Sequence, residues 1–428
     1  MTCRSLTYSR VVSSAAFACA TEPTVRGGDF ARRCDDVVGG LAAHFVWLNR
    51  GKESVALDLK SSAGMAVLRR LLDRADVLVS HLAPGATARL GIAPADLAVS
   101  RPGLIAVEID GYGSGGPLSH KRAYDLLVQA ESGACATTGR PGAPAKAGPP
   151  MADVSTGLYA ALSITALFCG KERGRVRGPT SAAVSLFDTM TELMGYSLTY
   201  TRHTGVDQEP KGMGSPAVAP YGACPTADGH TVVLGTTNDG EWQRLARELL
   251  GRPDLADDER LRSNSGRVAH SEVHDAEIGA WCARHDLAYV QDRADAAGIG
   301  NSRYNTPSEV VAHPHLTARD RWREIDTPGG PVPALLPPPV VSATSSRWGR
   351  SRLSANTPRP SSPSWGSAPT GSRCERGAGA APRRLGRRTD VDAEPSAPQE
   401  RDRRGVVARP AGRAHGRGGT IGPYGHSC

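Results

Sequence analysis

Asp153 is the side chain in this sequence that is best placed to do covalent chemistry. It follows Pro149-Pro150 and opens a segment through Cys169 that is apolar enough to form a buried helix. Position alone favours a helix N-cap role, because the amides at the start of a helix stabilise a carboxylate. The same ionised, partly enclosed carboxylate is also a competent nucleophile toward a thioester. Both roles stay open at this point.

A glycine-rich motif, GYGSGGP at 111–117, matches the GxGxxG pattern of dinucleotide-binding sites. In those sites the glycines open an apolar helix, and an acidic residue follows about 20 positions later. Here Pro117 and a polar stretch through Arg122 follow instead, which argues against a nicotinamide or flavin site. His120, beside Lys121, belongs either to an anion-binding patch or to a solvated loop.

The nine cysteines predict neither disulfides nor a metal centre. Their number is odd and no two have CxxC spacing, so neither a disulfide framework nor a zinc site is indicated. None has a companion histidine at a recognisable spacing, which argues against a thiol nucleophile. We expect no metal and no tightly bound cofactor.

Strand-like and helix-like segments alternate through the first half of the chain. The residue patterns predict strands at 54–60, 76–80, 104–109 and 181–187, and helices at 62–75, 124–132 and 153–169, with helical turns at 85–97. Such alternation is typical of an α/β fold in which helices cover a mostly parallel sheet. A strand at 231–235, helices near 241–250 and 271–285 and a helix at 312–323 follow.

Residue patterns and composition set off six parts of the chain. They are an N-terminal segment (1–26), a first unit (27–205), a polar, glycine-containing linker (206–218), a smaller α/β unit (219–305), a segment at 306–340 and a tail (341–428). The tail holds 16 Arg and 6 acidic residues, and Gly, Pro and Ser fill 34 of its 88 positions. So few large apolar residues remain that we predict disorder there.

Charge and hydropathy narrow the class of protein. The formal charge of +8 comes from the tail, since residues 1–340 hold 35 basic and 37 acidic side chains. Basic and aromatic residues do not alternate in the tail, which argues against a nucleic-acid partner. The sequence has no run of about 18 consecutive apolar residues, so it predicts no membrane span. The run Val11 to Ala20 has too few large apolar residues for a signal peptide, so we expect a cytoplasmic protein.

Six motifs occur in an order that resembles the class III CoA-transferases, a family that includes formyl-CoA transferase, carnitine CoA-transferase and α-methylacyl-CoA racemase. The resemblance spans about 27–339. The motifs are LNRGKESVALDLK (48–60), APGATARLGI (83–92), GYGSGGP (111–117), AYDLLVQAESG (123–133), MADVSTG (151–157) and RGPTSAAVSLFDTM (177–190).

The resemblance implies a fold, an assembly and a reaction. The fold would be a Rossmann-like large domain with a parallel sheet (27–205), a small α/β domain (219–305) and a return of the chain to the large domain (306–340), with an atypical N-terminal segment (1–26) before them. Two subunits would form an interlocked homodimer. Asp153 matches the family's nucleophile, which attacks an acyl-CoA thioester to give an aspartyl mixed anhydride and then an aspartyl-CoA thioester. The partners would be an acyl-CoA and a carboxylic acid acceptor; a small dicarboxylate is our expectation for the acceptor.

The family's CoA contacts carry over onto three stretches and one arginine. They are Leu57, Asp58, Leu59 and Lys60; His81, Leu82 and Ala83; Arg89; and Arg122, Ala123, Tyr124 and Asp125. Cationic side chains among them suit the phosphates of CoA. Gly235, Thr236 and Thr237 match a glycine-rich substrate loop in which threonines replace two glycines, a change expected to alter loop motion.

Two alternatives remain. A racemase or isomerase of the same family carries a histidine base where this chain has Tyr124, and an ordinary tyrosine is a poor base at neutral pH, which favours transfer. The second alternative is an inactive variant of the family whose basic tail associates with nucleic acid. Residues 1–26 do not show the family's opening strand, and the final strand-and-helix pattern is missing beyond about Val340. Both departures put activity in question.

Overall fold

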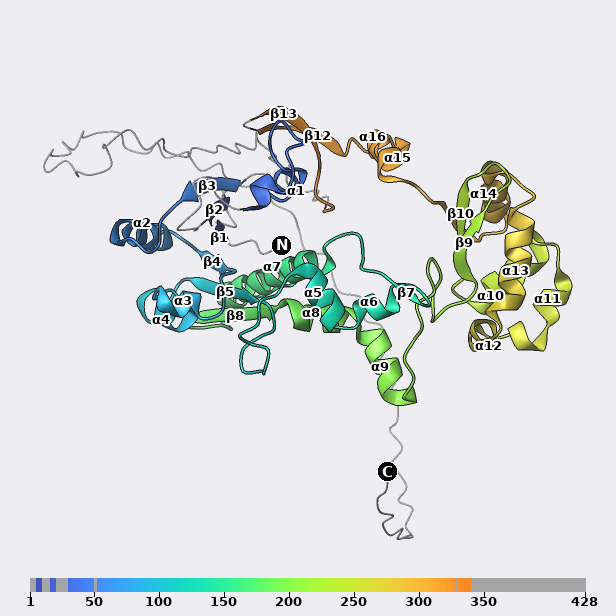
Figure 1. The fold of residues 1–428 in the computed structure, drawn as a ribbon, viewed down its shortest axis with the longest axis horizontal. Coiled ribbons are helices and arrows are strands. Elements are labelled where there is room, and N and C mark those ends of the chain that lie inside the picture. The colour runs from blue at the N-terminus through green and yellow to red at the C-terminus, as the bar shows by residue number, and fades with distance from the viewer. Residues whose placement is uncertain (1–4, 10–15, 21–29, 50–51, 328, 340–428) are drawn as a thin grey trace, which may run out of the picture. The chain divides into compact units, whose positions relative to one another are not determined.

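The computed structural model of the chain describes residues 5–9, 16–20, 30–49, 52–327 and 329–339. The tail at 341–428, for which disorder is predicted, lies outside the described residues. The main sheet has six strands in the order β3-β2-β1-β4-β5-β8 (Figure 1). These strands are β1 (Ser5–Ser9), β2 (Ala16–Ala20), β3 (Lys52–Ala56), β4 (Val77–Ser80), β5 (Ile105–Asp110) and β8 (Thr180–Ser185).

Most pairs in this sheet are parallel, which confirms the α/β fold class. β2 pairs parallel with β3, β4 with β5, and β5 with β8, whereas β1 runs antiparallel to both β2 and β4. The expectation that residues 1–26 lack an opening strand was therefore wrong. Strands pair through backbone groups, so β1 can pair with the free edge of β4 although the sequence of β1 lacks a long apolar run.

Both faces of β4 and β5 are buried, because alternate residues point to opposite sides of the sheet. Leu78 and Ala106 join one core with Leu68 and Leu72 of α2 (Ser62–Leu72). Val77, Ile105 and Val107 join another, with Ala160 of α7 (Met151–Glu172). The sheet is thus sandwiched between helices, and α7 packs along β5 and β8 (Figure 1).

Further short elements surround this sheet. They are η1 (Phe30–Arg33), α1 (Ala43–Leu48), α3 (Ala86–Arg89), α4 (Pro94–Ser100), α5 (Asp125–Glu131), α6 (Ala134–Thr137), β6 (Gly139–Arg140), β7 (Ala143–Pro144), α8 (Leu186–Leu193) and α9 (Gly195–Thr204). α5, α7 and α8 pack on one another around Ala152, Val128 and Leu186. This packing holds the first turn of α7 in place.

Residues 221–303 build a separate hydrophobic core, which we call the second core. It centres on Trp242, Leu245 and Leu261, all fully buried. Its sheet has the order β11-β10-β9. Its elements are β9 (Tyr221–Pro225), β10 (Thr231–Gly235), α10 (Asp239–Arg244), a π-helical turn (Leu245–Leu249), α11 (Pro253–Asp257), η3 (Glu259–Leu261), α12 (Asn264–Ala269), α13 (Ser271–Cys282), α14 (Leu287–Ala296) and β11 (Gly300–Arg303).

The segment after the second core ends in a hairpin. Helices α15 (Pro307–Val311) and α16 (Pro314–Ala318) precede strands β12 (Trp322–Thr327) and β13 (Gly330–Leu335). The predicted helix at 312–323 was wrong in its second half, because Asp320 adopts a left-handed φ of 48° and the chain then extends into β12. Gly329 approaches Gly39 so closely that a Cβ on Gly329 would lie 2.3 Å from the Gly39 carbonyl oxygen.

Candidate active site

Asp153 lies in the first turn of α7, and its carboxyl group is largely enclosed. The N-cap of α7 is Pro150, so the N-cap role for Asp153 was wrong. Burial raises the pKa of this carboxyl above its ordinary value; the charge of Asp125 acts in the same direction and His81 opposes them. The helix start would favour ionisation, but burial outweighs it. A carboxylate held away from water with a raised pKa is well suited to nucleophilic attack.

A buried chain of hydrogen bonds fixes the start of α7. The Ala152 amide donates to Asp125 Oδ1 at 2.9 Å, and Gln129 Nε2 donates to Asp125 Oδ2 at 2.8 Å. The Ala147 amide donates to Gln129 Oε1 at 3.0 Å. Asp125 therefore satisfies an amide that the helix itself leaves unpaired, one residue before Asp153. Sequence reasoning missed Gln129, whose signal is its spacing of four residues from Asp125 on one helix.

His81 follows β4 at the carboxyl end of the parallel strands. Its Nδ1 lies 2.9 Å from the Ile109 carbonyl oxygen in β5. A carbonyl oxygen only accepts, so Nδ1 carries the hydrogen and Nε2 remains for another partner. In open α/β sheets this edge is where ligands bind. His81 and Asp125 are the two predicted residues that act electrostatically on Asp153.

The glycine-rich loop after β5 serves close packing. A Cβ on Gly111 would lie 2.4 Å from Ala123 Cβ, and Gly113 has a φ of 76°. The Gly113 amide donates to the Asp110 side chain. Burial raises the pKa of Asp110, and the charges of Glu108 and Asp188 add to this. No helix begins at these glycines, and the first helix after them is α5, which starts at Asp125.

The predicted CoA contacts divide into buried and exposed side chains. Leu59 and Ala123 are buried in the hydrophobic cores, and Asp125 is 7% exposed, so their side chains face inward. Leu57, His81 and Leu82 are half-buried, whereas Asp58, Lys60, Ala83, Arg89, Arg122 and Tyr124 are exposed. β3 ends at Ala56, so the stretch from Leu57 to Lys60 forms a turn after the strand rather than its end. Exposed cations there are Lys60, Arg89 and Arg122.

Gly235, Thr236 and Thr237 lie at the end of β10 in the second core. Thr236 is 1% exposed, and its amide donates to the Pro220 carbonyl oxygen at 3.0 Å. The Thr237 amide donates to Glu241 Oε2 at 2.6 Å. The Thr237 hydroxyl also donates to Glu241 Oε2 at 3.1 Å, a bond that a glycine could not make.

In the described ranges no three His, Cys, Asp or Glu side chains are grouped so that they could hold a metal ion. One helix within those ranges, α7, is long and apolar enough to cross a membrane by length and composition. Its packing against β5 and β8 in a shared core accounts for part of this apolar character.

Comparison with known proteins identifies relatives of this arrangement. The model of CoA-transferase family III matches residues 20–353. Succinate–glutarate CoA-transferase of Agrobacterium fabrum is 33% identical over 315 residues, covering 72% of this chain and 77% of the relative. Succinyl-CoA–D-citramalate CoA-transferase of Chloroflexus aurantiacus is 30% identical over 299 residues, covering 69% of this chain and 74% of the relative.

Solved structures agree with these matches. A CAIB/BAIF family protein from Brucella suis is similar with a TM-score of 0.61 and 30% sequence identity. The similarity covers 76% of this chain and 85% of that protein. The similarity therefore extends over most of both chains.

Proposed function

Because this chain belongs to CoA-transferase family III, we propose that it moves CoA between two carboxylic acids through covalent intermediates on Asp153. The observation that carries the mechanism is the enclosed carboxyl group of Asp153 in the first turn of α7, with its pKa raised by burial. A desolvated carboxylate gains nucleophilicity because fewer water molecules must leave it during attack.

The reaction we propose runs in four exchanges, each of which conserves the acyl-transfer potential. The Asp153 carboxylate attacks the thioester carbonyl, and CoA thiolate leaves, which forms a mixed anhydride. The thiolate attacks the aspartyl carbonyl and expels the donor acid, leaving an aspartyl-CoA thioester. The acceptor carboxylate attacks that thioester to give a second anhydride and free thiolate. The thiolate then attacks the acceptor's carbonyl and releases the new acyl-CoA and the Asp153 carboxylate.

For the substrates we propose succinyl-CoA as donor and a small dicarboxylic acid as acceptor. The names of the two relatives above both pair succinyl or succinate with another dicarboxylic acid. We propose that the large and small domains follow the boundaries that the family resemblance implies, with Gly235 to Thr237 as the substrate loop. The setting we propose is the cytoplasm.

Trapping the intermediate tests this function. The protein is incubated with succinyl-CoA and then treated with hydroxylamine, and peptides are analysed by mass spectrometry. We expect a hydroxamate on Asp153, because hydroxylamine captures both an aspartyl anhydride and an aspartyl thioester. If no hydroxamate forms on Asp153 after incubation with succinyl-CoA, in protein shown to bind CoA, the mechanism is contradicted. Exchange of an α-proton of a branched acyl-CoA without transfer would favour the racemase alternative instead.

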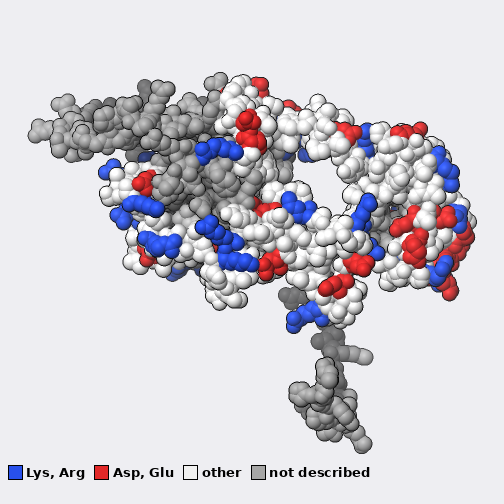
Figure 2. Space-filling view, viewed as in Figure 1, with Lys and Arg blue, Asp and Glu red and all other residues white. Residues whose placement is uncertain are grey.

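Phosphate binding near Arg89 gives a prediction for the acyl-CoA. Figure 2 shows Lys and Arg side chains gathered over the region of α2, α3 and α4. Arg89, exposed at the end of α3, is the member that matches the family's contact. We expect Arg89→Ala to raise KM for succinyl-CoA about 10-fold with little change in kcat, since a charge-assisted bond to phosphate is lost. Steady-state kinetics measure this.

The matched control for Arg89 is Arg70→Ala, which removes another exposed arginine, from α2. It should leave KM within about twofold of the wild type, because a general surface charge contributes little. Equal effects of both substitutions would show that the whole positive surface, rather than Arg89, attracts CoA.

For the assembly we propose the interlocked homodimer that the resemblance implies. Apolar side chains are exposed on α5, α7 and α9, three helices linked by packing through α8. The exposed members include Leu158 (66%) and Leu162 (63%), one turn apart on α7. Large exposed apolar surface of this kind is typical of a face that another protein covers.

A charge placed on this face should separate the subunits. We expect Leu158→Glu with Leu162→Glu to convert the dimer to a monomer, because two buried carboxylates would face an apolar partner surface. Light scattering coupled to gel filtration measures the mass. Val99→Glu is the control, since Val99 is 88% exposed on α4, away from this face. A wild-type protein that is monomeric at micromolar concentration would refute the assembly.

A further inference from the structure

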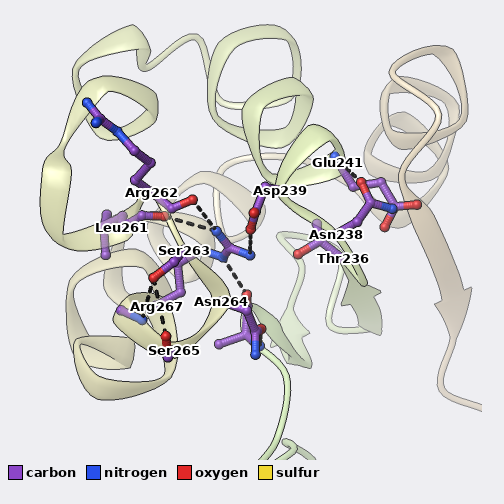
Figure 3. Close-up of polar contacts among 12 residues, drawn as sticks. Thr236, Asn238, Asp239, Glu241, Leu261, Arg262, Ser263, Asn264, Ser265 and Arg267 are labelled. Carbon is purple, nitrogen blue, oxygen red and sulfur yellow. Dashed lines mark hydrogen bonds and ion pairs between the residues drawn. The ribbon is translucent and has the colours of Figure 1, made fainter. Parts of the chain in front are cut away.

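Arg267 of α12 is a buried cation in the second core whose guanidinium is almost fully hydrogen-bonded. Its side chain is 1% exposed. Nε donates to the Ala219 carbonyl oxygen at 2.8 Å, and Nη1 donates to the carbonyl oxygens of Leu261 at 3.0 Å and Arg262 at 3.2 Å. Nη2 donates to Asp239 Oδ1 at 2.8 Å (Figure 3). A buried charge is tolerated only with partners of this kind.

Two buried side chains, those of Trp242 and His274, also contact Arg267. Its guanidinium lies 5.7 Å from the centre of the Trp242 ring, which is fully buried. The ring of His274, also fully buried, contacts the Arg267 carbonyl oxygen through Nε2 at 3.0 Å. Both the backbone and the side chain of Arg267 are therefore held in place by the second core. The guanidinium can then fix the position of the groups that accept its hydrogen bonds.

Arg267 binds first the segment at residues 217–219, through which the chain enters the second core. Arg267 binds the Ala219 carbonyl, and Asn264 of the same helix donates to the Ala217 carbonyl oxygen at 2.9 Å. The Ala219 amide donates back to Asn264 Oδ1 at 3.2 Å. Two side chains of α12 thus hydrogen-bond to residues 217–219.

The second structure is the loop from Gly235 to Gly240, which contains the proposed substrate residues. Thr236 binds the Pro220 carbonyl, next to the carbonyl that Arg267 binds. Asn238 accepts from the Glu241 amide at 2.9 Å, and Asp239 binds Arg267. Figure 3 shows Asp239 directed toward the guanidinium from α10. Loop and entering segment therefore meet at one arginine.

We propose that Arg267 is a positioning residue that latches the Gly235–Gly240 loop through Asp239. The two partners differ in exposure, because the Asp239 side chain is 64% exposed and that of Arg267 is 1% exposed. Water can replace the arginine at Asp239, whereas the carbonyl bonds of Arg267 stay in place, so the pair is the releasable end of the latch. A loop held in this way is preorganised for the acid that it contacts. The inference rests on the function proposed above for its catalytic meaning.

The test is Asp239→Asn, with Asp257→Asn as the matched control. Asp257 is also an exposed carboxylate paired with an arginine, Arg247, but that arginine is itself 43% exposed. We expect Asp239→Asn to speed amide hydrogen exchange of residues 236–240 at least about 10-fold. We also expect it to raise KM for the acceptor acid about 5- to 10-fold while kcat changes less than threefold, because the acid must order the freed loop. Asp239→Glu, which keeps the charge, should restore much of both.

Amide exchange and kinetics separate the latch from the function. Unchanged exchange in Asp239→Asn, or an equal increase in Asp257→Asn, would overturn the latch whatever the activity. Faster exchange in a protein that transfers CoA, but with unchanged KM for the acid, would overturn the role of the latch in substrate binding. Faster exchange in a protein whose wild type transfers no CoA would leave the latch standing and refute the proposed function instead.

Discussion

Replacing Asp153 by asparagine is expected to lower kcat for CoA transfer by at least about 1,000-fold and, at neutral pH, to raise the melting temperature. The loss of activity follows because the amide cannot form the aspartyl anhydride, and removal of a covalent nucleophile typically costs this much or more. The gain in stability follows because burial raises the pKa of Asp153, so the folded protein holds the ionised carboxylate at a cost.

The sign of the pH dependence distinguishes this effect from ordinary stabilisation. Below the ordinary aspartate pKa of 3.8, the carboxyl is protonated in both folded and unfolded protein and costs nothing. As pH rises, the unfolded protein ionises first, and the folded protein loses stability until its own raised pKa is passed. The difference in melting temperature between Asp153→Asn and the wild type should therefore shrink as pH falls from neutral toward the ordinary pKa of 3.8.

The matched control for Asp153 is Asp96→Asn, which removes an exposed carboxylate from the first turn of α4. We expect it to keep full activity and to lower the melting temperature slightly at neutral pH, since an exposed acid there stabilises the helix. Calorimetry and kinetics measure both variants, and mass spectrometry verifies that the introduced amide has not deamidated. A destabilised Asp153→Asn would show that the carboxylate is stabilising where it lies.

Much of the main sheet could be predicted from local patterns. The strand expected at 104–109 is β5, and the helix expected at 153–169 is α7, because both are apolar stretches whose period matches their burial. β1 could not be predicted, since it is recruited by the free edge of β4. β13 was hidden by Pro331 and Pro333, which usually argue against a strand but are accepted in a two-stranded hairpin.

The candidate site shows the same division between local and tertiary information. Asp153 stood out by its place before an apolar helix, and the family resemblance supplied its role. The link from Ala147 through Gln129 and Asp125 to Ala152 depends on how α5 packs on α7, which no local pattern states. Arg267 was missed for the same reason, because three of its four partners are backbone carbonyls and the fourth, Asp239, lies 28 residues away in the sequence.

Asp125→Asn is expected to lower kcat about 10- to 100-fold and to shift the acid limb of the pH profile to lower pH. An asparagine can still accept the Ala152 amide with its oxygen, but its NH₂ group then faces the NH₂ group of Gln129. Turning Gln129 over would in turn place its NH₂ against the Ala147 amide. One buried donor loses its partner in either case, which costs about 1–3 kcal/mol and loosens the first turn of α7.

The shift in the pH profile separates the charge of Asp125 from its hydrogen bonds. That charge raises the pKa of Asp153, so its removal should let Asp153 ionise at lower pH, and kcat/KM should then fall only under more acidic conditions. Asp188→Asn is the comparison, because its charge acts on Asp110 rather than appearing among the groups that shift Asp153. A loss of activity with an unmoved acid limb would mean that Asp125 acts on Asp153 only by holding α7. A limb that moves to lower pH would show that the charge of Asp125 acts on Asp153 in the working enzyme. The residue that accepts the Ala152 amide would then also contribute to the basicity of the nucleophile.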